Sequence, residues 1–242
     1  MILADTRHHL TRADAQLALH LIARGPEGSL EGAEALLRDR GIDALLDDSR
    51  LLAALMSAPQ GAYASLPLFA YVVVRHALLS VGEDDRRIAD YVSAVFTHFA
   101  RRGNVDRVAA ADDETYDTLA ALAEDLDSPD ARRAFLVRAH LGNYALWLSG
   151  LFPDHIETRR WRRGGPDLGY YEEMGSRGFR LAAGHRLAEQ HGLTPLYERA
   201  AERFAVLRLA LNRVSDRLLF PHVHTPERLM RQVKDEVMFR LS

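Results

Sequence analysis

Polar and aromatic side chains that could bind a ligand are concentrated in the second half of the chain. His140, Tyr144 and Trp147 are spaced i, i+4 and i+7, so a helix would place them on one face together with Asn143. Aromatic rings and a few polar groups are typical of small-molecule pockets. We expect a pocket between this helix and the one that follows Pro166, or else a buried hydrogen-bond network that fixes helix packing. The expected lining is His140, Asn143, Tyr144, Trp147, Asp167, Tyr170, Tyr171 and Glu172.

A basic cluster lies between these two expected helices. Four arginines surround Trp161 and precede the turn sequence Gly-Gly-Pro-Asp. Guanidinium groups bind carboxylates and phosphates through paired hydrogen bonds, and an aromatic ring can stack on a planar ligand. The alternative is a solvated helix end whose arginines complement the helix dipole. The residues expected to bind anions are Arg159, Arg160, Arg162 and Arg163.

The sequence lacks the signatures of several enzyme classes. It has no cysteine, which excludes thiolate nucleophiles and disulfides. Its single lysine, Lys234, is followed by Asp235, so no phosphate-binding P-loop is present. None of the 11 histidines belongs to a Glu-x-x-His or His-Glu-x-x-His motif, so we expect no metal site and assign no cofactor. Ser176 lacks a hydrolase elbow, because Met174 stands where its first glycine would.

The composition is that of a soluble globular protein. Hydrophobic residues make up 48% of the chain and charged residues 27%, and the formal net charge is -3. This charge gives no general attraction to nucleic acid or to an anionic membrane. The longest apolar run, residues 66–74, is about half as long as a membrane-spanning helix, and the N-terminus lacks a secretory signal. We expect a cytoplasmic protein with neither a membrane segment nor a nucleic-acid partner.

Helix signals occur along the whole chain, and no segment shows the alternation of a half-buried strand. The fold predicted is therefore all-α, a single domain over residues 1–242 with about ten helices. Residues 103–113 are the one candidate boundary if there are two domains. The expected helices span residues 11–24, 29–40, 43–57, 66–80, 84–102, 114–126, 129–151, 154–163, 166–191, 195–219 and 226–241.

Capping residues mark several of these boundaries. A hydroxyl side chain before proline predicts a helix start, because the hydroxyl caps the first turn and proline fits the first helical position. Glycine predicts a helix end, because it adopts the left-handed conformation. The expected starts are at Ser65, Ser128-Pro129, Thr194-Pro195 and Thr225-Pro226, and the expected ends at Gly41, Gly103 and Gly192.

Two helix faces indicate close packing. In the helix after Pro166, Gly175, Gly178 and Ala182 leave one face almost without side chains, which suits either a tightly packed helix or a bound ligand. The segment 195–219 carries a heptad pattern that predicts packing along another helix, either in the same chain or in a homodimer. The heptad positions are Tyr197, Ala200, Phe204, Leu207, Leu211, Val214 and Leu218.

Residues 135–150 read FLVRAHLGNYALWLSG and resemble the distal-helix region of haem oxygenases. In that family an apolar helix leads into a glycine-rich kink beside the haem. The family's Gly-Asp-x-Ser-Gly-Gly run is replaced here by GNYALWLSG, and no spacing selects a proximal ligand among His8, His9 and His20. The resemblance therefore implies a helical architecture and leaves the cofactor unassigned.

These patterns lead to three hypotheses about function. The first is a protein without catalytic activity that binds a small ligand or a partner around Tyr144 and Tyr170. The alternative is an enzyme with a helical pocket, of haem-oxygenase-like or thiaminase-like architecture, that acts on a small aromatic or phosphorylated molecule. Glu172 or His140 would then transfer the proton. The third is a dimeric interaction module that assembles through residues 195–219.

Overall fold

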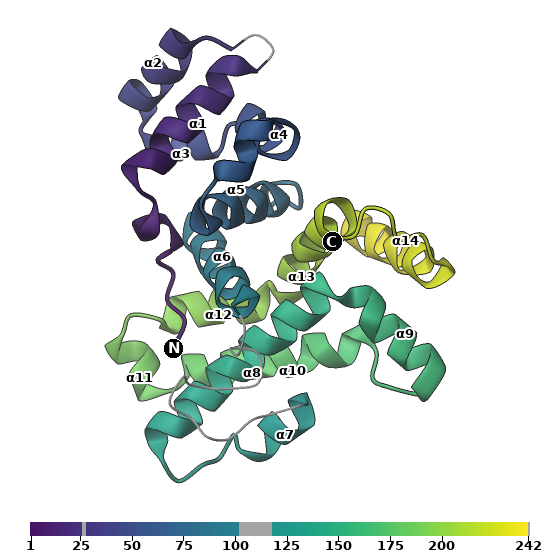
Figure 1. Ribbon diagram of the computed structural model, residues 1–242. Coiled ribbons are helices and arrows are strands. Elements are labelled where there is room, and N and C mark those ends of the chain that lie inside the picture. Colours follow the sequence, from purple (N-terminus) through teal and green to yellow (C-terminus); the bar gives the residue numbers. More distant parts are fainter. Residues whose placement is uncertain (26–27, 102–117, 242) are drawn as a thin grey trace. The chain divides into compact units, whose positions relative to one another are not determined.

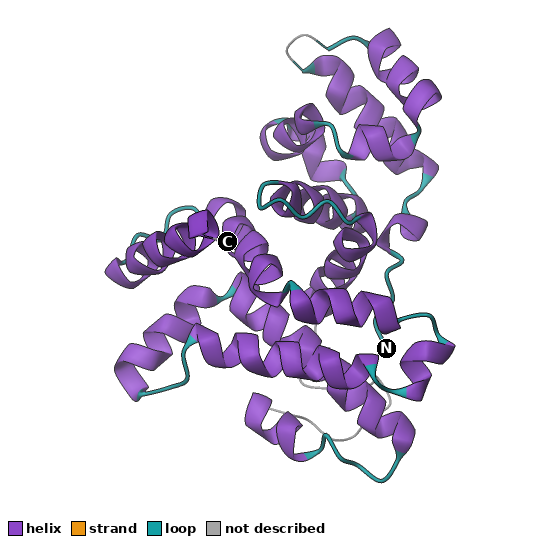
Figure 2. Ribbon diagram, turned by 180° about the vertical axis from the view of Figure 1, so that it is seen from behind, coloured by secondary structure: helices purple, strands orange, loops and turns teal. Residues whose placement is uncertain are grey.

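The computed structural model describes residues 1–25, 28–101 and 118–241, and these ranges contain helices and no strand (Figures 1 and 2). The all-α prediction is confirmed. The described ranges hold 14 α-helices, of which 11 have seven or more residues, in agreement with a bundle of about ten helices. None of the helices in these ranges has both the length and the apolar character needed to cross a membrane.

The described helices form two compact units that divide between Thr97 and His98. The N-terminal unit consists of the short 3-10 helix η1 (Thr6–His9), α1 (Arg12–Arg24), α2 (Leu30–Arg40), α3 (Ile42–Leu46), α4 (Ser49–Ser57), η2 (Pro59–Tyr63), α5 (Leu66–Leu79) and most of α6 (Arg86–Ala100). The expected boundary at residues 103–113 lies outside the described residues. The single domain expected over the whole chain stays a prediction.

The C-terminal unit carries the residues expected to bind a ligand. Its helices are α7 (Leu119–Glu124), α8 (Ala131–Leu151), α9 (Pro153–Arg163), α10 (Leu168–Ala183), α11 (Arg186–Gln190), α12 (Thr194–Glu202), α13 (Phe204–Val214), a π-helical turn (Ser215–Leu219) and α14 (Pro226–Leu241). α8 and α10 make the most extensive contact between any two helices in the described chain, and α13 packs on α8 as well.

Two of the four expected helix starts are confirmed in full. The Ser65 hydroxyl accepts a hydrogen bond from the Leu68 amide at 3.2 Å and caps α5. The Thr225 hydroxyl accepts one from the Arg228 amide at 3.2 Å and caps α14. In both helices a hydroxyl oxygen thus satisfies an amide that has no partner in the first turn.

The other two starts differ from expectation. α8 begins at Ala131, because Asp130 caps it in place of Ser128 and accepts the amides of Arg132 and Arg133. A carboxylate is favoured there, since it also interacts with the positive end of the helix dipole. α12 does begin at Thr194, but its hydroxyl donates to the Ala183 carbonyl at 3.2 Å and ties α12 to the end of α10.

Helices end where expected at two of the three predicted glycines, which are the two that the structure describes. Gly41 and Gly192 have φ of 77° and 62°, a region that favours glycine, and Gly103 lies outside the described residues. Three expected helices are each interrupted once. The breaks occur at Asp47 and Asp48, at Gly184 and His185, and at Arg203.

The heptad residues of 195–219 pack inside the C-terminal unit. Tyr197, Phe204 and Leu207 are buried, and the two helices that carry them contact α8 and α10. The heptad residues therefore pack against helices of the same chain, which is one of the two arrangements that the sequence left open. A homodimer through residues 195–219 stays a prediction, and it would use the exposed face of this segment.

His76 gives the N-terminal unit a pH-dependent stability. Its ring lies 3.1 Å from the Leu46 carbonyl, and burial lowers the pKa of His76 below 6.5. The unfolded chain then binds more protons as the pH falls through about 6.5, so acid favours unfolding. The stabilising contribution of His76 is fully present above about pH 6.5. It decreases as the pH falls from there to the lower pKa that His76 has in the folded protein.

Urea denaturation at about pH 7.5 and at about pH 5.5 gives the free energy of unfolding at each pH. We expect this free energy to fall more between the two pH values in wild type than in His76→Gln. Glutamine keeps a donor for Leu46 but does not titrate. Equal losses in the two proteins would show that His76 does not contribute.

Candidate functional site

Glycines bring α8 and α10 close together. A Cβ on Gly178 would lie 2.7 Å from the Gly142 nitrogen and 2.9 Å from the Arg138 carbonyl oxygen of α8. A Cβ on Gly175 would lie 2.2 Å from the Phe204 ring. Neighbouring protein atoms fill this face, so the stripe of small residues serves tight helix packing. No room for a ligand is left along it.

His140, Tyr144 and Trp147 do share one face of α8, as predicted. The ring centroids of His140 and Tyr144 are 6.0 Å apart, and those of Tyr144 and Trp147 are also 6.0 Å apart. Phe99, in the last turn of α6, packs on all three rings at 5.3–6.3 Å. His140 and Asn143 are buried within the same unit. His140 and Trp147 thus contribute aromatic packing contacts, and the hydrogen-bond network expected as the alternative stays a prediction.

Tyr144 also belongs to a cavity of about 370 Å³ beside α8 and the start of α10, which we call the tyrosine cavity. It lies between the two helices that the sequence predicts would enclose a pocket. Its volume is within the range of about 300–1,000 Å³ that is common for small-molecule sites, toward the small end. The lining residues are Thr118, Leu119, Ala120, Tyr144, Leu148, Arg159, Pro166, Tyr170 and Tyr171.

The tyrosine cavity combines aromatic walls with one cationic group. Tyr171 is buried, which raises the pKa of its phenol, so the hydroxyl stays protonated at neutral pH and can donate a hydrogen bond. The Arg159 guanidinium opposes that shift electrostatically. Tyr170 packs edge-to-face on Tyr171 with ring centroids 5.7 Å apart. Within the part of the chain that the structure describes, Arg159 forms no ion pair, so its charge is available to a ligand.

The remaining expected site residues lie elsewhere. Asp167 and Glu172 line a second cavity of about 330 Å³, together with Arg160. Asp167 caps α10 by accepting the Tyr170 amide at 3.0 Å. Because α10 carries its tyrosines and Glu172 toward different cavities, the expected lining does not converge on one site.

The four arginines near the end of α9 do not share one binding surface either. Arg159 lines the tyrosine cavity and Arg160 the second cavity, whereas Arg162 and Arg163 are exposed in the last turn. Gly164 then ends α9 in the left-handed conformation. For Arg162 and Arg163 this is the solvated helix end that the sequence offered as the alternative.

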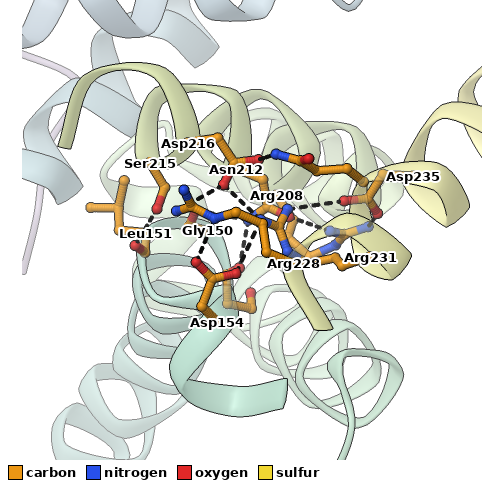
Figure 3. Close-up of polar contacts among 12 residues, drawn as sticks. Gly150, Leu151, Asp154, Arg208, Asn212, Ser215, Asp216, Arg228, Arg231 and Asp235 are labelled. Atoms are coloured by element: carbon orange, nitrogen blue, oxygen red, sulfur yellow. Dashed lines mark hydrogen bonds and ion pairs between the residues drawn. The ribbon is translucent and has the colours of Figure 1, made fainter. Parts of the chain in front are cut away.

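A buried ion cluster in the C-terminal unit was not expected from the sequence. Arg208, Arg228 and Arg231 are each only 4% exposed. Arg228 and Arg231 of α14 donate hydrogen bonds to Asp154 of α9 at 2.7 Å and 3.2 Å. Figure 3 shows the three side chains lying together. Among the residues that the structure describes, the ion pairs of this cluster join Asp154, Glu172, Arg208, Asp216, Arg228, Arg231 and Asp235.

Carboxylates match every arginine of the cluster. Arg208 donates to Glu172 and, at 2.8 Å, to Asp235, while Arg231 donates to Asp216 at 2.6 Å. Three guanidinium groups face four carboxylates, so the cluster offers no excess positive charge to an anion. Its role is to join α9, α10, α13 and α14. A signal was present, since Arg228, Arg231 and Asp235 are spaced i, i+3 and i+7.

Asn212 extends this polar interior to the end of α8. Its amide nitrogen donates to the Ser149 and Gly150 carbonyls at 2.7 Å and 2.8 Å, and the Ser215 hydroxyl donates to the Leu151 carbonyl at 2.8 Å. These are the carbonyls that a helix end leaves without intrahelical partners. The contacts explain how α8 can end inside the unit.

The N-terminal unit contains a cavity of about 590 Å³, which is larger than the tyrosine cavity. Its walls are mainly apolar, and most of its charged groups already have partners. Arg7 donates to Asp43 at 2.9 Å, and Asp14 forms a capping box with Thr11. The lining comes from η1, α1, α2, α3 and α5 without any motif, so the sequence did not indicate it.

The described residues contain no group of three or more His, Asp or Glu side chains placed to hold a metal ion. No protein-family profile, curated protein sequence or solved structure matches this chain.

Proposed function

We propose that this protein binds a compact ligand, with an aromatic ring and a carboxylate or phosphate group, in the tyrosine cavity and does not convert it chemically. The observation that supports this is the meeting of three tyrosines and Arg159 at one cavity. The tyrosine rings would hold the ligand ring by stacked or edge-to-face contacts. Arg159 would bind the acidic group, and the protonated Tyr171 phenol would donate a hydrogen bond.

The groups that the enzyme alternative requires are placed away from this cavity. Glu172 is bound to Arg208 in the ion cluster, and His140 is buried against Tyr144 and Phe99. A proton-transfer group needs to come within hydrogen-bond reach of the reacting atom. Neither residue lines the tyrosine cavity, which favours binding without catalysis. The cytoplasmic location expected from the sequence stays a prediction.

Phenyl phosphate is a suitable probe, because it carries both features of the proposed ligand. We expect it to bind wild type in a calorimetric titration, and Arg159→Gln to weaken binding about ten- to a hundredfold, since a hydrogen bond to a charged group contributes about 1.5–3 kcal/mol. Arg162→Gln is the matched control. It removes an exposed arginine from the same helix without touching the cavity and should leave binding unchanged.

Two comparisons separate the parts of this proposal. Inorganic phosphate should bind much more weakly than phenyl phosphate, because it lacks the ring; equal binding would contradict the aromatic part. Release of phenol by wild type, abolished in Glu172→Gln or His140→Asn, would contradict the non-catalytic part.

A further inference from the structure

α14 is amphipathic in the reverse of the usual sense. Its buried face is charged, because Arg228, Arg231 and Asp235 lie in the ion cluster (Figure 3). Its outer face is apolar. The outward side chains are Leu229, Met230, Val233 and Val237, which are 63%, 53%, 57% and 53% exposed.

Trp161 of α9 is also exposed, by 61%. It lines the second cavity together with Met230, and the charged side chains of Glu227 and Lys234 line that cavity as well. Single exposed apolar residues are normal, but a contiguous group indicates an interaction site. Covering such a surface removes apolar area from water, at about 25 cal/mol per Å².

We propose that the apolar face of α14 pairs with the same face of a second copy of this chain, with the two helices antiparallel. Met230, Val233 and Val237 are spaced by three and four residues, as in the core of a helix pair. An identical face on the partner makes a closed twofold interface, which limits assembly to a dimer.

The flanking charges determine the orientation. Glu227 and Lys234 are seven residues apart and therefore flank the same side of the apolar face. In an antiparallel pair the same flanks of the two helices meet, so Glu227 lies opposite Lys234 of the second copy, twice. In a parallel pair Lys234 lies beside Leu229 of the second copy, and these opposite charges are not paired.

The same charges disfavour a lipid surface as the occupant. Helices that lie on membranes are rich in Lys and Arg on their polar face. Among the described side chains of α14, Lys234 is the one exposed cation, and it is accompanied by Glu227 and Glu236. Mixed charge beside an apolar face suits a protein partner with the complementary order of charges, which this face itself provides.

Light scattering during size-exclusion chromatography of the full chain tests this proposal. We expect a dimer at micromolar concentrations, and Val233→Glu should raise the dissociation constant at least about a hundredfold, because like charges would meet near the twofold axis. Val233 is exposed in the single chain, so the thermal unfolding of this variant at low concentration should match that of monomeric wild type. Leu219→Glu, an exposed position in residues 195–219, is the control and should leave the dimer intact.

A charge exchange tests the orientation. Lys234→Glu should weaken the dimer, and the double variant Glu227→Lys, Lys234→Glu should restore it. The proposal is overturned if wild type stays monomeric at about 100 µM, or if Val233→Glu dimerises as tightly as wild type. It is also overturned if Leu219→Glu loses the dimer, or if the double variant does not restore it. So would a monomer that co-sediments with vesicles containing anionic lipid.

Discussion

Arg208→Ala should lower the free energy of unfolding by about 3–5 kcal/mol, because removing one partner of a buried ion pair leaves uncompensated charge in the interior. Arg208 is buried, and it donates to Glu172 and Asp235. Without the guanidinium, both carboxylates lose a partner inside the unit. Urea denaturation followed by circular dichroism measures the effect.

Arg177→Ala is the control for this prediction, since Arg177 is an exposed arginine on α10. Surface substitutions usually change stability by less than about 0.5 kcal/mol. If Arg208→Ala is no more destabilising than Arg177→Ala, the ion cluster does not join the helices of the C-terminal unit as described.

Gly178→Val should destabilise the protein by about 3 kcal/mol or more, and Gly178→Ala by about 1–3 kcal/mol. The added Cβ would lie 2.7 Å from the backbone nitrogen of Gly142, and backbone atoms of α8 cannot rotate away as a side chain could. Alanine gains about 1 kcal/mol in helix propensity, which offsets only part of this cost. The midpoint of thermal unfolding reports the net effect.

Gly169→Ala provides the matched comparison within α10. Its new Cβ would meet only the Asp167 side chain, at 3.4 Å or more, so this variant should be neutral or slightly stabilised. Equal unfolding midpoints for Gly169→Ala and Gly178→Ala would show that α8 and α10 are not in close contact at Gly178.

Local signals predicted the helices well and their exact caps less well. The hydroxyls of Ser65 and Thr225 cap helices as expected, because only the first turn of each helix is involved. Thr194 shows the limit of this reasoning. Its hydroxyl donates instead to Ala183, a residue that only tertiary packing brings near. The break between α12 and α13 at Arg203 could likewise not be predicted, because no glycine or proline lies there.

The candidate site was predicted in part, for a similar reason. Helical spacing placed His140, Tyr144 and Trp147 on one face, and the structure confirms that face. Spacing cannot tell which side of α10 faces which neighbour, so it grouped Glu172 with Tyr170 although they line different cavities. Burial of the charged face of α14 also depends on partners far away in the sequence, such as Asp154.

Ligand occupancy of the tyrosine cavity is measured most directly by fluorine NMR of protein labelled with 3-fluorotyrosine. The chain has eight tyrosines, and Tyr→Phe variants assign their signals. Phenyl phosphate should shift the signals of Tyr144, Tyr170 and Tyr171 and leave that of Tyr63, which is exposed in the N-terminal unit, unchanged. A titration that shifts none of the three, or that shifts Tyr63 equally, would contradict ligand binding at this cavity.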